Sequence, residues 1–123
     1  MNQLVFVALG GAIGSVMRYL FSVTITHYVG RTFPWGTLVV NIIGSLIMGY
    51  LFVKFVEHRT LSNEMRSLLM IGLLGAFTTY STFSIETLGL FESGLIIRAI
   101  SNILLNVFLC LLAVWCGVLL ARS

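Results

Sequence analysis

The stretch from Gly72 to Ser84, "GLLGAFTTYSTFS", lies inside a segment that is apolar enough to cross a membrane. It nevertheless contains glycine at Gly72 and Gly75, and then a run of hydroxyl-bearing residues: Thr78, Thr79, Tyr80, Ser81, Thr82 and Ser84. Glycine and crowded β-branched residues weaken an α-helix. Backbone groups freed inside a membrane are tolerated only where they are buried in protein or face water or an ion. The stretch therefore predicts a helix break from Gly75 to Thr79, with free carbonyls that could hold a small cation.

The composition of the whole chain points to lipid as its solvent. Of its 123 residues, 59% are hydrophobic and 9% are charged, whereas a soluble domain has roughly a quarter of its residues charged. The net charge of +3 is spread along the chain without a basic run, which argues against nucleic-acid binding. The chain has no Asp and four Glu, so it offers few groups for enzymatic chemistry.

Four apolar segments are long enough to cross a membrane. They run approximately from Leu4 to Ile25, from Trp35 to Val56, from Met65 to Phe91 and from Leu95 to Ala121. Each meets the length of ~20 residues that the hydrocarbon core requires. The connections between them leave no room for a soluble domain. We therefore expect an all-α integral membrane protein, with residues 1–123 forming a single membrane domain and the third helix broken in mid-membrane.

Small residues recur four apart in the first two segments. Gly10 and Gly14, and likewise Gly11 and Ser15, have this spacing in the first segment, and the second offers Gly44, Ser45 and Gly49. Small residues at this spacing allow helices to approach closely. The pattern therefore predicts helix packing at these positions.

The distribution of cationic side chains gives only a weak orientation signal. The side of the membrane that holds both termini and the second connection carries four of them: Lys54, Arg59, Arg66 and Arg122. The opposite side carries two, Arg31 and Arg98. A difference of two is a weak positive-inside signal. Two alternatives stay open on these counts: one fixed orientation, or insertion in both orientations with antiparallel pairing.

Two charged residues lie where lipid disfavours them. Arg18 is well inside the first segment, where a charge costs roughly 3 kcal/mol unless it snorkels, pairs or faces water. It either snorkels to the interface or attracts anions at a pore mouth. Glu86 is the only acid well inside a segment. It is either a cation or proton site, a partner for an arginine, or part of a vestibule near the far interface.

Asparagines provide a second set of polar candidates. Asn41 is the only amide in the second segment, where it either bonds another helix or donates to an anion. Asn102, Asn106 and Cys110 follow an i, i+4, i+8 spacing, which places them on one helix face. Two asparagines on one stripe indicate a polar path along the fourth helix.

The second half of the opening stretch suits an anion. The hydroxyls of Ser81, Thr82 and Ser84 can donate hydrogen bonds. Tyr80 and Phe83 are three residues apart and share a helix face. Aromatic ring edges carry positive partial charge, so they can meet an anion without trapping it too deeply for conduction.

At these residues the chain closely resembles the small fluoride channel family, also called Fluc or CrcB. The family signature is similar to G-x-x-G-[AG]-[FL]-T-T-F-S-T-F-S, which stands here as "GLLGAFTTYSTFS". Further matches are "GGAIGSVMRY", "WGTLVVNIIGSLIMG" and the asparagine stripe, so the resemblance covers essentially the whole chain. It implies a four-helix protein that forms an antiparallel dual-topology homodimer, with paired fluoride pores and a central structural sodium ion.

The resemblance also implies roles by position. The fluoride-pore residues that it implies are Arg18, Asn41, Tyr80, Ser81, Thr82 and Phe83, with a weaker match at Asn102, Asn106 and Cys110. The backbone carbonyls of Gly75 and Thr78 are implied as the sodium ligands. One departure is Tyr80, which stands where the family typically has phenylalanine and adds a hydroxyl and bulk to a narrow lane.

The expected function is passive, selective fluoride efflux across the inner membrane of a bacterial cell, which lowers cytoplasmic fluoride. The runner-up is a small four-helix, dual-topology exporter of drugs or cations. That class needs an acid in its first helix, where this chain has Arg18. An intramembrane enzyme needs paired acids, a Ser–His pair or a metal cluster. The chain has no Asp, and His27 and His58 both lie near connections, so none of these sets is assembled and we do not expect an enzyme. The expected partners are fluoride, the lipid bilayer and a second copy of the chain.

Overall fold

The computed structural model describes residues 2–123, which are helical apart from short connections and contain no strand. The elements are α1 (Asn2–Val29), α2 (Trp35–Phe52), the π-helical η1 (Val53–Glu57), α3 (Asn63–Arg66), the π-helical η2 (Ser67–Leu74), α4 (Gly75–Phe77), α5 (Tyr80–Glu92) and α6 (Ile96–Arg122). They combine into four segments long and apolar enough to cross a membrane: Asn2–Val29, Trp35–Glu57, Asn63–Glu92 and Ile96–Arg122. The all-α prediction with four such segments is confirmed.

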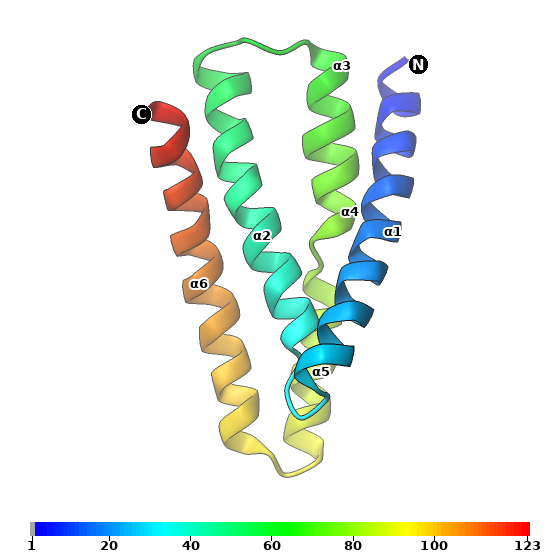
Figure 1. The fold of residues 1–123 in the computed structure, drawn as a ribbon, viewed down its shortest axis with the longest axis vertical. Coiled ribbons are helices and arrows are strands. Elements are labelled where there is room, and N and C mark those ends of the chain that lie inside the picture. Colours follow the sequence, from blue (N-terminus) through cyan, green and yellow to red (C-terminus); the bar gives the residue numbers. More distant parts are fainter. Residues whose placement is uncertain (1) are drawn as a thin grey trace.

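The long segments alternate in direction along the longest axis of the molecule (Figure 1). The start of α1, the end of α6 and the connection between η1 and α3 lie at one end. The α1–α2 and α5–α6 connections lie at the other end. These two turns each contain a glycine with positive φ, Gly30 at 106° and Gly94 at 77°. L-residues with a side chain rarely adopt this conformation, so glycine allows the chain to reverse within a few residues.

Backbone-to-backbone packing at glycines joins α6 to α2. A Cβ atom at Gly117 would lie 2.1 Å from the carbonyl oxygen of Leu46, and one at Gly49 would lie 2.2 Å from that of Val114. Only a residue without a side chain fits at either position. The two helices therefore touch through their main chains, which is the close approach that small residues permit in membranes.

The same kind of contact joins α1 to η2. A Cβ atom at Gly10 would lie 2.1 Å from the carbonyl oxygen of Leu68, and one at Gly14 would lie 2.1 Å from that of Leu73. The packing prediction is thus confirmed for Gly10, Gly14, Gly44 and Gly49. At Gly11 an added Cβ atom would meet no atom within 4 Å, so no close contact requires glycine there, although a Cβ atom at Gly72 would lie 3.0 Å from the backbone nitrogen of Gly11.

Few side chains are fully buried within one chain. Val40, Val53 and Leu74 are at most 1% exposed, whereas most large apolar side chains of α1 and α6 are exposed. An apolar exterior of this kind suits lipid or another protein surface rather than water. The fully buried core of a single chain is therefore small.

We predict that Gly117→Ala destabilises the protein by about 1–3 kcal/mol, the usual cost of overpacking. The added methyl would meet the backbone of α2, which cannot move aside without separating the helices. Thermal unfolding in detergent measures the effect.

The matched control is Gly11→Ala, because Gly11 is a helical glycine with open space around it. Replacing it should leave stability unchanged or raise it slightly, since alanine favours helix more than glycine does. Equal unfolding temperatures for the two variants would contradict the proposed backbone contact between α2 and α6.

Candidate functional site

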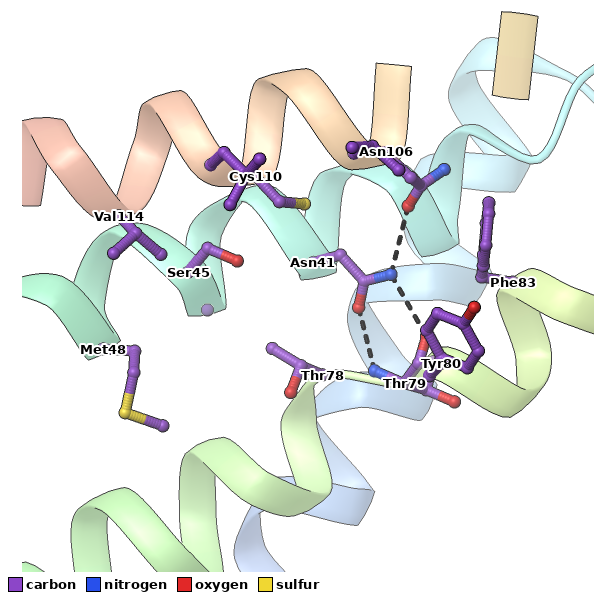
Figure 2. Close-up of a pocket in the computed structure, with 13 residues that line it drawn as sticks. Asn41, Ser45, Met48, Thr78, Thr79, Tyr80, Phe83, Asn106, Cys110 and Val114 are labelled. Carbon is purple, nitrogen blue, oxygen red and sulfur yellow. Dashed lines mark hydrogen bonds between the residues drawn. The ribbon is translucent and has the colours of Figure 1, made fainter. Parts of the chain in front are cut away.

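The sequence motif lies beside an open cavity of about 460 Å³ between α2, α5 and α6 (Figure 2). Its lining combines amides, hydroxyls, a thiol and aromatic rings, and its polar and aromatic members are Asn41, Ser45, Thr78, Thr79, Tyr80, Phe83, Asn106 and Cys110. No carboxylate, lysine or arginine lines it among residues 2–123. We call it the amide cavity.

The helical segment Asn63–Glu92 is interrupted next to this cavity. Thr78 (φ −83°, ψ 154°) and Thr79 (φ −149°, ψ 121°) have extended backbones, and α5 begins at Tyr80. The sequence placed the start of the irregular stretch at Gly75, which instead has helical angles. The helix persists further than expected because the amide of Thr78 still donates to the carbonyl of Leu74 at 3.1 Å.

Asn41 on α2 bonds the main chain of the interruption. Its Oδ1 accepts from the backbone amide of Thr79 at 2.8 Å, and its Nδ2 donates to the carbonyl of Thr79 at 3.1 Å. The same Nδ2 donates to Oδ1 of Asn106 at 3.2 Å (Figure 2). Both amide hydrogens of Asn41 thus have acceptors within the chain, since a primary amide has only two.

The asparagine stripe of α6 continues this polar line. Asn106 donates to the backbone and side-chain oxygens of Asn102, each at 2.9 Å, and Asn102 donates to Oγ1 of Thr87 at 2.9 Å. Asn102 is 1% exposed and Asn106 is 6% exposed. The predicted stripe therefore faces the inside of the bundle, where a line of hydrogen bonds runs from Asn41 to Thr87. Cys110 lies one turn further along α6 and lines the amide cavity.

The hydroxyl of Thr79 caps α5. It accepts from the backbone amide of Thr82 at 3.2 Å and donates to the hydroxyl of Thr82 at 3.1 Å. A threonine with extended backbone that accepts from the third residue of a helix is a standard N-cap. Thr79 is the functional candidate that sequence reasoning missed. The available signal was the residue type, because threonine is favoured at the N-cap of a helix and Thr79 precedes Thr82 by the three positions that this cap requires.

The aromatic pair of the motif lies together, as its spacing predicted. The ring centroids of Tyr80 and Phe83 are 5.5 Å apart, with the planes inclined at 56°. Both rings line the amide cavity, but Phe83 is buried whereas Tyr80 is 81% exposed. The tyrosine ring therefore stands at the open side of the cavity.

The remaining predicted residues lie elsewhere. Arg18 and Thr82 line a second cavity of about 380 Å³ between α1, α2 and α5, together with Glu86. Ser81 is exposed and lines neither cavity. The hydroxyl of Ser84, also outside both cavities, donates to the carbonyl of Tyr80 on its own helix. The structure thus divides the predicted set, and Thr79 is the residue that lines both cavities.

Glu86 has a hydroxyl partner rather than an arginine. Oγ1 of Thr37 donates to its carboxylate at 2.5 Å. Among residues 2–123 the one ion pair joins Arg122 to Glu57. The interpretation of Glu86 as a partner for an arginine is therefore wrong within a single chain.

Four apolar helical segments that enclose a line of buried amides and hydroxyls define a multi-pass membrane protein with a polar interior. Comparison with known families narrows this class. Residues 5–118 match the family described as "CrcB-like protein, Camphor Resistance (CrcB)". The chain belongs to this CrcB family, as its resemblance to the family signature implied.

Named relatives cover nearly the whole chain. A protein of Magnetococcus marinus is 49% identical over 98% of this chain and 98% of its own length. Proteins of Hahella chejuensis (49% identical, covering 98% of this chain and 94% of the relative) and Shewanella loihica (50% identical, covering 95% and 94%) are similar. All three are named "Fluoride-specific ion channel FluC".

We predict that Asn102→Leu lowers stability by about 1–3 kcal/mol, because it removes two side-chain hydrogen bonds and leaves Thr87 without its donor. Unfolding in detergent, followed by loss of the helical circular dichroism signal, measures this. Ser101→Ala, which removes the neighbouring hydroxyl from outside the asparagine line, is the control and should leave stability unchanged. A similar loss in both variants would argue against the line as a source of stability.

Proposed function

We propose that the protein is a fluoride-selective channel that lets fluoride leave the cell passively and so lowers cytoplasmic fluoride. The lining of the amide cavity carries this proposal, because it offers amides, hydroxyls and ring edges without a fixed charge. Fluoride is small and strongly hydrated, so a path for it must replace water by close donors. The relatives' name supports the same function, and as a name for ion channels it also supports the expectation that the protein is not an enzyme.

The proposed anion contacts lie around Asn41. One of its amide hydrogens bonds the main chain, and the other points to the side-chain oxygen of Asn106. An anion that enters the cavity would replace this oxygen as the acceptor. The ring edges of Tyr80 and Phe83 are the next favourable contacts. Such weak, repeated contacts allow an ion to enter and also to leave.

We assign Ser81, Thr82 and Arg18 to the path beyond the rings, with Asn102 and Asn106 supporting it along α6. Thr82 and Arg18 line the second cavity, which adjoins the amide cavity at Thr79. Arg18 is half-buried there, and its guanidinium would draw anions toward this cavity. The carboxylate of Glu86 in the same cavity limits the net positive potential, which disfavours prolonged binding.

We further propose that the functional unit is an antiparallel homodimer. Gly75, Tyr80 and Ser81 are exposed in the single chain although they lie in a membrane-length segment. Exposed polar groups are costly against hydrocarbon, so a second copy is the proposed cover. The difference of two cationic groups between the ends of the molecule is a weak orientation bias, which permits insertion in both directions.

The interruption at Thr78 and Thr79 is proposed as the break of the third membrane helix and as a sodium site. In a continuous helix the amides of Thr79 and Thr82 would donate to the carbonyls of Gly75 and Thr78. They donate to Asn41 and to the Thr79 hydroxyl instead. The carbonyls of Gly75 and Thr78 are the two sodium ligands that the family resemblance implied, and carbonyl oxygen suits a hard cation. Since two carbonyls are too few, the site would need both chains of the dimer.

The proposed location is the bacterial inner membrane, since the relatives come from bacteria and the chain has four membrane-length helices. The alternative of a drug or cation exporter has no support from the family or its named members. Its usual acid is also missing from α1, where Arg18 stands.

We expect liposomes that contain the purified protein to release fluoride at least about tenfold faster than chloride, a difference of about 1.4 kcal/mol in barrier. Release should need neither ATP nor a proton gradient, because neutral donors only lower the barrier to passive flow. Ion-selective electrodes measure both halides, with protein-free liposomes as the control. Equal release of the two halides, or strict dependence on a proton gradient, would refute the fluoride channel.

For the dimer we expect cross-links between opposite ends of α1. Leu4 and Tyr28 are exposed and separated by about 36 Å along the helix. With Cys110 and Cys116 replaced by Ala, chains carrying Leu4→Cys and chains carrying Tyr28→Cys would be mixed in one membrane and treated with linkers of graded length. Antiparallel pairing predicts that a short linker joins a Leu4→Cys chain to a Tyr28→Cys chain. The same linker should join neither two Leu4→Cys chains nor two Tyr28→Cys chains. Coupling of each variant only to its own kind would indicate parallel pairing.

A further inference from the structure

Thr79 is held from two sides by bonds that do not belong to a helix. Asn41, which is 38 positions away in the chain, bonds both the amide and the carbonyl of Thr79. The Thr79 hydroxyl in turn bonds the amide and the hydroxyl of Thr82. A paired exchange with one residue's amide and carbonyl is the arrangement found between neighbouring β-strands. Asn41 therefore acts on this residue as a strand partner would.

The extended step at Thr78 and Thr79 determines where α5 begins. An extended residue advances the chain by about 3.3 Å, compared with about 1.5 Å for a helical one. Two residues that returned to helical angles would shorten this step by roughly 3.6 Å and rotate α5. The rings of Tyr80 and Phe83 follow immediately, so both would move relative to Asn106 across the amide cavity.

We propose that Asn41 and Thr79 together form a lock that holds the interruption extended and thereby positions the aromatic pair in the ion path. Asn41 acts as a positioning residue through the main chain of Thr79, as well as lining the cavity. Thr79 supplies the second half of the lock through its hydroxyl. The inference about ion passage rests on the proposed fluoride channel, whereas the inference about the backbone does not.

A role of Asn41 as an anion donor alone makes a different prediction. One of its amide hydrogens and its oxygen are committed to Thr79, so replacing Asn41 should alter the interruption itself. A pure donor would change ion flow and leave the backbone as it is. Thr79 is buried, and its hydroxyl is already engaged with Thr82, so its loss likewise tests the cap rather than a free donor.

Hydrogen–deuterium exchange of the full-length protein in detergent, read by mass spectrometry, separates these roles. We expect Asn41→Leu and Thr79→Val to raise exchange in peptides that cover residues 79–82 by roughly two- to tenfold, as loss of a hydrogen bond does. Peptides from α1 and α6 should be unchanged. Thr79→Ser keeps the hydroxyl and should restore the parent pattern, and Ser101→Ala is the control for loss of a hydroxyl outside the lock.

Fluoride efflux from liposomes is measured on the same preparations. Efflux should be lost in Asn41→Leu and Thr79→Val and retained in Thr79→Ser. Unchanged exchange at residues 79–82 together with lost efflux would overturn the lock and leave Asn41 a donor only. Faster exchange in every helix would also overturn it, because the pair would then contribute only general stability. Failure of the parent protein to pass fluoride would refute the channel function and leave the exchange result standing.

Discussion

A chain that crosses hydrocarbon must satisfy its backbone hydrogen bonds within the protein, because lipid offers no partner. Continuous helices meet this demand by themselves except at their ends, and α1 and α6 are uninterrupted. The chain departs from continuous helix beside the amide cavity, where Thr78 and Thr79 are extended. A side chain from α2 and a hydroxyl from the interrupted segment then supply the missing partners. The irregular backbone thus depends on one asparagine that α2 brings to it.

That asparagine reaches its partners because the helices approach so closely. Gly49 and Gly117 let the backbones of α2 and α6 touch, and Asn41 consequently meets Asn106 at 3.2 Å. Gly44, on the same helix as Asn41, leaves room for the methyl group of Thr78. A Cβ atom at Gly44 would lie 2.2 Å from that methyl group. Glycine packing and the polar line are therefore parts of one arrangement. Bulk added at the glycines would separate the amides even though it touches none of them.

Composition and spacing were sufficient to predict the four helical segments and the inward stripe of Asn102 and Asn106, because length, hydropathy and i, i+4 spacing are local properties. The extent of the interruption was not predictable in the same way. Gly75 is a poor helix former, yet it stays helical because its neighbours keep their bonds. The role of Thr79 depends on Asn41, 38 positions away, and no local pattern reports such a contact. Likewise, sequence could not separate Arg18 and Thr82 from the amide cavity, since this division depends on how α1 packs.

The interruption also brings the opposite ends of two helix dipoles within two residues of each other. The helical run that ends at Phe77 directs carbonyl groups toward it, and α5, which begins at Tyr80, directs amide groups toward it. Negative and positive partial charge of about half an elementary charge each therefore meet at one depth in the protein. Asn41, Thr78 and Thr79, which surround this point, carry no proton that dissociates near neutral pH. The dipoles that meet at the interruption are therefore fixed, and acidification or alkalinisation within the physiological range leaves these dipoles unchanged.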